Sequence, residues 1–144
     1  MNRKVAIIDP LGAHGSSHHF YLFGQAEGLL KNGVSVSLYT NNETDNPNIK
    51  GLKFFTFYYN IFSSNSDFLS GLKWVFGSLF SMIHARFSGV SVFHFHIFYS
   101  NILVFLNLLL VKLLFGKVVL TVHDVSSFAN SSDSSIFSRI IYKF

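Results

Sequence analysis

The stretch KVAIIDPLGAHGSS, residues 4–17, gives the clearest indication of the fold. It begins with a short apolar run, and a turn-rich loop containing Gly12 and Gly15 follows. A buried parallel strand that leads into a glycine loop is the structure this pattern predicts. Ser16 and Ser17 close the loop as candidates for the N-cap of a helix.

Beyond this stretch, helix and strand patterns alternate along the chain. The first helix ends at Lys31-Asn32-Gly33, with Gly33 in the left-handed cap position. Period-two or β-rich strand patterns follow at 34–40, 52–59, 90–96 and 117–122. Further helical patterns cover 68–87 and 102–115.

The alternation predicts an α/β protein: a Rossmann-like, doubly wound parallel sheet with helices on both faces. In such sheets, ligands bind beyond the carboxyl ends of the strands. Three loops meet this criterion, Pro10–Ser17, Ile97–Asn101 and His123–Ser127. We therefore expect the functional residues to come from these loops.

The composition limits the classes of function and partner. The chain has 144 residues, enough for one domain, and is 12% charged, about half the usual share. Its net charge of +4 is spread along the chain, which favours an anionic membrane surface over nucleic acid as a partner. Without cysteine, disulfides, thiolate nucleophiles and Cys-ligated zinc are excluded. Because residues 1–9 lack a signal-peptide pattern, we expect a cytoplasmic protein, peripheral at the inner face of the membrane.

A long apolar segment, residues 102–122, raises the question of a membrane span. Asn107, Lys112 and Lys117 interrupt it, and Gly116 is followed by β-branched residues. The segment is therefore predicted to form a helix, a turn and a strand. We expect its helix to be buried or to touch a membrane without crossing it.

The first loop has two interpretations. Gly12, Gly15, Ser16 and Ser17 precede a helix, and backbone N–H groups at a helix N-terminus suit an anion. The loop matches neither the G-x-G-x-x-G pattern nor a P-loop. The spacing alone favours the other interpretation, an ordinary strand–helix connection.

Six histidines lie in or near the expected strand ends: His14, His18, His19, His94, His96 and His123. His94 and His96 are two residues apart and so share one strand face. No carboxylate stands beside them at a recognisable ligand spacing, so we predict no metal site. His94 is expected in the core, and His96, at the strand end, in the cleft.

His123 and Asp124 directly follow the last strand, where a polar pair has positional meaning. A neutral imidazole there can hydrogen-bond a sugar hydroxyl or a phosphate. A helix-capping aspartate and a surface histidine are the alternative. The chain has no Ser-His-Asp order, no nucleophile elbow and no acidic pair placed for glycoside hydrolysis.

Three segments, in order, resemble the N-terminal domain of glycosyltransferase family 4, the retaining group-1 enzymes. LLKNGVSV at 29–36 is similar to the family's L-x-x-x-G-H-x-V run. VFHFH at 92–96 is similar to D-[IV]-[IV]-H-x-H, and KVVLTVHD at 117–124 to K-[VIP]-V-x-T-x-H-D. The resemblance covers nearly the whole chain.

This resemblance implies a single acceptor-side half of a GT-B enzyme, which would transfer sugar from a nucleotide-sugar to a glycan or lipid-linked acceptor in cell-surface polysaccharide assembly. It implies His123 as the catalytic residue, and Gly12, Gly15, Ser16, Ser17, His96 and Asp124 as substrate-binding residues. It implies no cofactor and no metal. The domain would cover residues 1–125, before a Ser-rich loop and the start of a truncated helix at 126–144. In the family, the C-terminal domain holds the nucleotide-sugar and contains a Glu-x7-Glu element. This chain has no such element, so we expect a fragment whose donor domain is separate.

Two other functions remain open. A non-catalytic, membrane-associated or partner-binding α/β domain would explain the low charge and the missing donor half. A Rossmann enzyme with a nucleotide cofactor is less favoured, because Thr40-Asn41-Asn42 stands where an acidic residue would close the second strand.

Overall fold

The structure is a computed structural model that describes residues 3–14, 17–63, 66–98, 100–123 and 141. Within these residues, five strands form one parallel sheet in the order β3-β2-β1-β4-β5. The strands are β1 (Lys4–Asp9), β2 (Ser35–Asn41), β3 (Lys53–Tyr58), β4 (Val92–Ile97) and β5 (Lys117–Val122). The helices are α1 (His18–Lys31), α2 (Asp67–Phe87) and α3 (Ile102–Leu113).

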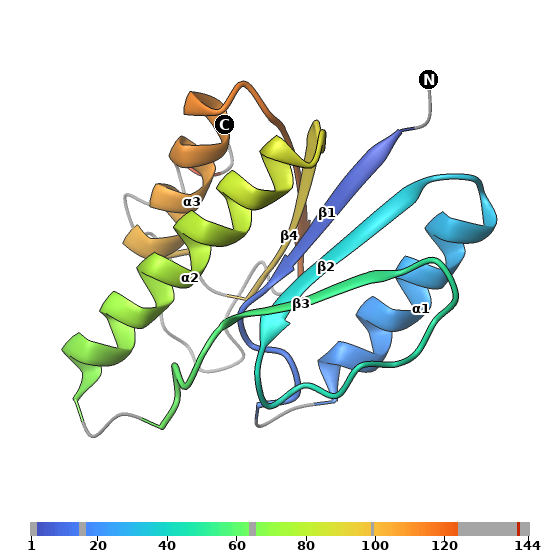
Figure 1. The fold of residues 1–144 in the computed structure, drawn as a ribbon. Helices are drawn as coiled ribbons and strands as arrows, with labels where there is room; N and C mark the ends of the chain where they lie inside the picture. Colours follow the sequence, from blue (N-terminus) through green and yellow to red (C-terminus); the bar gives the residue numbers. More distant parts are fainter. Residues whose placement is uncertain (1–2, 15–16, 64–65, 99, 124–140, 142–144) are drawn as a thin grey trace.

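The helices cover both faces of the sheet. α1 lies on one face, and α2 and α3 lie side by side on the other (Figure 1). This arrangement confirms the predicted α/β class and the Rossmann-like, doubly wound parallel sheet. Of the expected final segment, 126–144, only Ile141 belongs to the described residues.

The central strand β1 separates two hydrophobic cores. Ile7 packs with Leu22 and Ala26 of α1, whereas Ala6 and Ile8 face the core beneath α2 and α3. Successive side chains of a strand point to opposite faces, so a strand covered on both sides needs apolar residues throughout. This requirement explains why residues 5–8 form a continuous apolar run instead of an alternating pattern.

The helix α1 ends as its sequence predicts. The N–H of Gly33 donates to the carbonyl of Leu30 at 3.0 Å, and that of Val34 to Leu29 at 3.1 Å. These bonds form a Schellman motif, and Gly33 adopts a φ of 75°. The same motif at Gly89 ends α2 and uses the N–H of Val90, which is why β4 begins at Val92 and not at the predicted residue 90.

The long apolar segment 102–122 divides into α3, a turn and β5, as expected. The Asn101 side chain caps α3 by accepting a hydrogen bond from the N–H of Val104 at 3.0 Å. Among the helices of the described residues, none combines the length and the hydropathy needed to cross a membrane.

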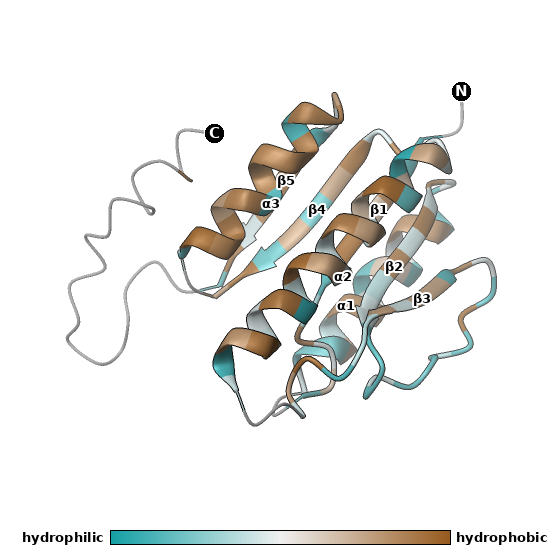
Figure 2. Ribbon diagram, turned by 60° about the vertical axis from the view of Figure 1, so that its left-hand side comes forward, coloured by the Kyte–Doolittle hydropathy of each residue, from teal (hydrophilic) through white to brown (hydrophobic). Residues whose placement is uncertain are grey.

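The outer side of the α2–α3 layer is unusually apolar, and Figure 2 shows both helices dominated by hydrophobic residues. We call the exposed large hydrophobic side chains on these two helices the apolar outer face. It consists of Phe68, Leu69, Leu72, Val75, Phe76, Phe80, Phe87, Ile102, Leu106, Leu109 and Leu113.

Candidate functional site

Two histidines meet at the carboxyl edge of the sheet. His96 is near the end of β4, and His123 directly follows β5. Because β4 and β5 pair in parallel, with His96 opposite Thr121, both strands end at the same level. His96 Nδ1 lies 2.9 Å from His123 Nε2. The structure thus brings together two residues that the sequence selected separately.

A chain of hydrogen bonds fixes the protons on these rings. Gln25 of α1 places its Oε1 3.0 Å from His96 Nε2 and its Nε2 3.3 Å from His94 Nδ1. A carbonyl oxygen only accepts, so His96 donates from Nε2 and must accept at Nδ1 from His123. His94 accepts from Gln25 and donates from Nε2 to Thr121 Oγ1 at 2.8 Å. One arrangement of neutral rings therefore satisfies every bond.

The electrostatic environment favours these neutral rings. Burial first, and then repulsion of the charged form by the neighbouring His94, His18 and His123, lower the pKa of His96 to about 3. Burial also lowers the pKa of His94. The pKa of His18 is lowered by burial first, and then by His123 and His19. These three imidazoles are thus neutral at pH 7.

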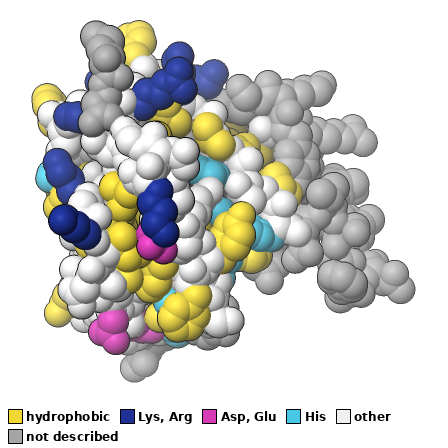
Figure 3. All heavy atoms as spheres, turned by 90° about the vertical axis from the view of Figure 1, so that its right-hand side faces the viewer, with side chains coloured by type: hydrophobic (Ala, Val, Ile, Leu, Met, Phe, Trp, Pro, Cys, Tyr) yellow, Lys and Arg dark blue, Asp and Glu magenta, His cyan; other side chains and the backbone are white. Residues whose placement is uncertain are grey.

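A third histidine completes what we call the imidazole cluster: His18, His96 and His123. His18 is the first residue of α1, and its ring centre lies 4.6 Å from that of His123 and 5.3 Å from that of His96. One ring nitrogen from each of the three residues lies within 4.8 Å of the others. Histidine side chains reach the surface on the α1 side of the molecule, beside hydrophobic ones (Figure 3).

Aromatic rings surround the imidazole cluster. Phe98 stacks on His123 with ring centres 4.6 Å apart, and its edge contact with His18 is 4.7 Å. Tyr21 lies 5.7 Å from the His96 ring and 5.9 Å from the His123 ring. Sequence reasoning did not single out Tyr21, Phe98 or Gln25, because aromatic and amide residues on helices and loops carry no local signal for a site.

The first loop is packed more tightly than an open anion-binding loop. Gly12 is buried with a φ of 51°, and a Cβ there would collide with Thr44 and lie 2.7 Å from Asn41 Oδ1. The Gly12 N–H donates to Asp9 Oδ2 at 3.2 Å. Packing against the end of β2 is therefore one requirement for a glycine at this position, which the resemblance implies is a substrate-binding residue.

The other predicted site residues divide into two groups. Ser17 stands at the N-cap of α1, as expected, but its side chain makes no capping hydrogen bond. Gly15, Ser16 and Asp124 lie outside the described residues.

One buried acidic residue was not identified from the sequence. Asp9, the last residue of β1, is 4% exposed, and burial raises the pKa of its carboxyl to about 6 despite hydrogen bonds from the Gly12 and Leu11 backbone. The sequence feature that could have identified Asp9 is its position as an acidic residue at the end of a mostly apolar strand.

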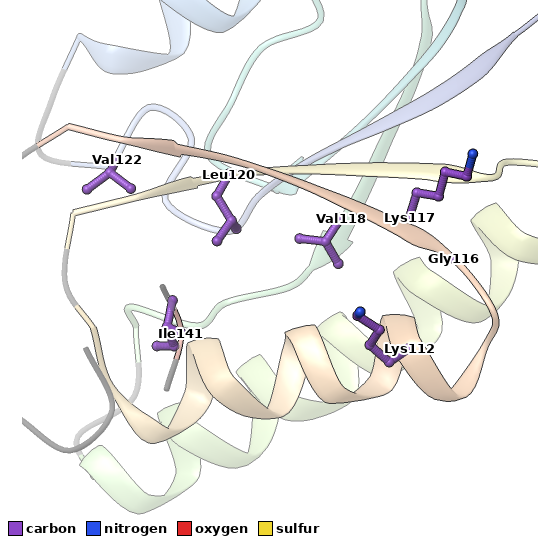
Figure 4. A pocket seen from close by; sticks show the side chains of 7 residues that line it. All are labelled: Lys112, Gly116, Lys117, Val118, Leu120, Val122 and Ile141. Atoms are coloured by element: carbon purple, nitrogen blue, oxygen red, sulfur yellow. The ribbon is translucent and has the colours of Figure 1, made fainter. Parts of the chain in front are cut away.

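Two cavities differ in their chemistry. A crevice of about 130 Å³ opens at the switch point between β1 and β4, where the strand order reverses. Its walls are Pro10, Leu11, Trp74, His96, Ile97, Phe98, Asn101, Leu103 and Val104. A larger cavity of about 490 Å³ lies between α3 and β5, where Val118 and Leu120 face Lys112 and Ile141 (Figure 4). The crevice combines apolar walls with the imidazole of His96, and we take it, with the imidazole cluster, as the candidate site.

Comparisons with known proteins assign neither a family nor a function to this chain. No model of a known family matches this chain, and no curated protein matches it. A solved structure of phenylacrylic acid decarboxylase from Aquifex aeolicus is similar, with 16% identity, a TM-score of 0.41, and coverage of 83% of this chain and 81% of that one. A UDP-galactose 4-epimerase structure has 12% identity and a TM-score of 0.39, over 66% of this chain and 38% of that one. The chain is a Rossmann-like α/β protein that these comparisons assign to no family.

Proposed function

We propose that this chain is the acceptor-binding half of a retaining glycosyltransferase, which moves sugar from a nucleotide-sugar to a glycan or lipid-linked acceptor. The observation that carries the proposal is the 2.9 Å contact between His96 and His123. These two residues come from separate segments that resemble the same family, and they meet where ligands bind in this fold.

The positions of the resembling segments support the proposal. Residues 29–36 run from the end of α1 into β2, residues 92–96 lie in β4, and residues 117–122 form β5. Each segment therefore occupies the element that the resemblance implies. His96 and His123 both resemble cleft histidines of the family, and their side chains border the same site. The two resemblances therefore support one proposal.

The role proposed for His123 is a hydrogen bond to the sugar. Its Nε2–H is engaged by His96, which orients the ring and leaves Nδ1 as an acceptor in the neutral form. A sugar hydroxyl can donate to Nδ1. The contact accelerates transfer only if it strengthens as the anomeric carbon gains positive charge.

The apolar outer face supports an acceptor at a membrane. It combines four strongly exposed phenylalanines, Phe68, Phe76, Phe80 and Phe87, with a chain of low overall charge and net positive sign. Such a surface suits peripheral contact with an anionic bilayer. The same observation favours the second candidate function, a non-catalytic domain that binds a membrane or a partner.

Acceptor binding can be tested on the chain itself. We would titrate metal-free, ¹⁵N-labelled protein with alkyl glycosides and with farnesyl phosphate. Chemical-shift changes should gather around His96, Phe98 and His123, and His123→Ala should weaken them. His84→Gln is the matched control, because His84 bonds Tyr39 on the α2 side of the sheet. Changes confined to the apolar outer face would favour the non-catalytic alternative, and a folded protein without changes would refute acceptor binding.

Transfer is the second test. The chain alone should not transfer sugar, because the preorganised donor site is expected in a separate domain. Once combined with a donor domain, His123→Ala should lower turnover by roughly ten- to a thousandfold. Full turnover in this variant would assign His123 a structural role.

A further inference from the structure

The imidazole cluster has the composition of a metal site, although the spacing of its residues in the sequence gave no sign of one. Its members come from the start of α1, the end of β4 and the residue after β5. Three ring nitrogens, one from each residue, lie within 4.8 Å of one another. Neutral imidazole is the commonest metal ligand in proteins, and three histidines with one open position are a known catalytic zinc arrangement.

We propose that His18, His96 and His123 bind a divalent transition-metal ion, Zn²⁺ first among them, and leave one coordination position open. The proposal goes beyond the function proposed above and does not depend on it, since that function concerns the metal-free protein, in which His123 carries its proton on Nε2. It also departs from the expectation of no metal site, which rested on ligand spacing along the sequence.

The distances allow coordination after a small movement. Tetrahedral zinc with Zn–N bonds of about 2.0–2.1 Å holds its ligand nitrogens about 3.4 Å apart. His96 Nδ1 and His123 Nε2 are 2.9 Å apart, so this pair would open slightly. The nitrogen of His18, within 4.8 Å of the other two, would move closer to them.

The positions of the ring protons on His96 and His123 are compatible with a bound metal ion. His96 already directs the lone pair of Nδ1 into the cluster, because its Nε2–H donates to Gln25. Such an outer hydrogen bond commonly fixes the tautomer and orientation of a metal-binding histidine. His123 would release Nε2 by moving its proton to Nδ1, a tautomer change without net loss of a proton.

The surroundings also fit. Phe98 and Tyr21 wall the cluster with aromatic rings, and an apolar shell limits the access of water to a bound ion. Three neutral imidazoles leave both charges of the ion uncompensated. The open position would therefore take water, hydroxide or an anionic oxygen such as that of phosphate.

The direct test is a titration of chelator-treated protein with ZnCl₂ by calorimetry, and with CoCl₂ by visible absorption. We expect one ion per chain and a tetrahedral Co²⁺ spectrum. His18→Asn, His96→Asn and His123→Asn should each weaken binding by at least tenfold. Gln25→Leu should weaken it by about ten- to a hundredfold, the range for outer-shell partners. His14→Gln and His84→Gln should leave it unchanged, since these rings contact Glu43 and Tyr39 instead.

A second measurement keeps the test informative if a variant does not fold. In wild-type protein with ¹⁵N-labelled histidine, zinc should switch His123 from the Nε2–H to the Nδ1–H tautomer and leave His96 as Nε2–H. Absence of binding, or equal binding in all the variants, would overturn the proposal and leave the cluster as a hydrogen-bond network. The titration contains no sugar or lipid, so its failure is separate from a failure of acceptor binding.

Discussion

At the scale of the single residue, His96 should make the protein sensitive to acid. Its folded pKa, about 3, lies below the ordinary value of 6.5. Above pH 6.5 the ring is neutral in both the folded and the unfolded chain, so its titration does not lower the free energy of unfolding there. As the pH falls from 6.5 toward 3, only the unfolded chain takes up this proton. The free energy of unfolding should then fall by up to about 1.4 kcal/mol per pH unit.

Urea unfolding at several pH values, with a chelator present, measures this slope. His96→Asn should flatten it between pH 6.5 and 4.5, although the variant is less stable at pH 7.5. An equal slope in both proteins would show that His96 does not cause the acid sensitivity.

Asp9 should have the opposite effect. Its folded pKa, about 6, exceeds the ordinary value of 3.8. Ionisation of Asp9 therefore leaves the free energy of unfolding unchanged below pH 3.8 and lowers it as the pH rises through 6. The difference corresponds to up to about 3 kcal/mol. Asp9→Asn keeps an acceptor for the Gly12 N–H and stays neutral. It should therefore raise the melting temperature at pH 8 and change it little near pH 4. A lower melting temperature at pH 8 would mean that the loop stabilises the charged carboxylate.

At the scale of the element, the end of α3 differs from those of α1 and α2. Its left-handed position is held by Phe115, with a φ of 55°, and not by the adjacent Gly116. Gly116 meets another demand, since a Cβ there would lie 2.8 Å from atoms of Phe93 and Val111. Close packing therefore requires glycine at position 116, whereas the left-handed position 115 is occupied by phenylalanine.

Two substitutions at this turn should have opposite signs. Phe115→Gly removes left-handed strain and should stabilise the protein by about 1 kcal/mol, or roughly 3 °C in melting temperature. Phe115 is 90% exposed, so little packing is lost. Gly116→Ala overpacks the core and should cost about 1–3 kcal/mol. Thermal unfolding of both variants measures these effects, and destabilisation by Phe115→Gly would contradict this account of the turn.

At the scale of the whole molecule, the apolar outer face should govern membrane binding. Each exposed phenylalanine contributes up to about 1.5–3 kcal/mol when fully buried. Phe76→Ser combined with Phe80→Ser should therefore weaken binding to phosphatidylglycerol vesicles by tenfold or more. Sedimentation with vesicles measures the loss, and added salt should weaken binding of the wild type.

Phe20→Ser is the matched control, because Phe20 is 65% exposed on α1, across the sheet. Equal losses in the control and the double variant would indicate nonspecific adhesion. Binding that resists salt and yields only to detergent would contradict a peripheral contact.

The sequence by itself determined the elements of this protein and their order. Residues 5–8 are all apolar because β1 is covered on both faces. Gly33 ends α1 because the left-handed position after a helix favours glycine. Signals of this kind act over a few residues, so they can be detected without the fold, and the alternation they define suffices for a doubly wound parallel sheet.

Only the tertiary structure decided which side chains meet. His18, His96 and His123 are separated by many residues, and their contacts depend on the pairing of β4 with β5 and on the position of α1. The burial of Asp9 and the crowding at Gly116 likewise depend on distant segments. Local periodicity specifies the face on which a side chain lies, but not its neighbour from another element. That neighbour is set by strand register and helix packing, which arise when the whole chain is folded.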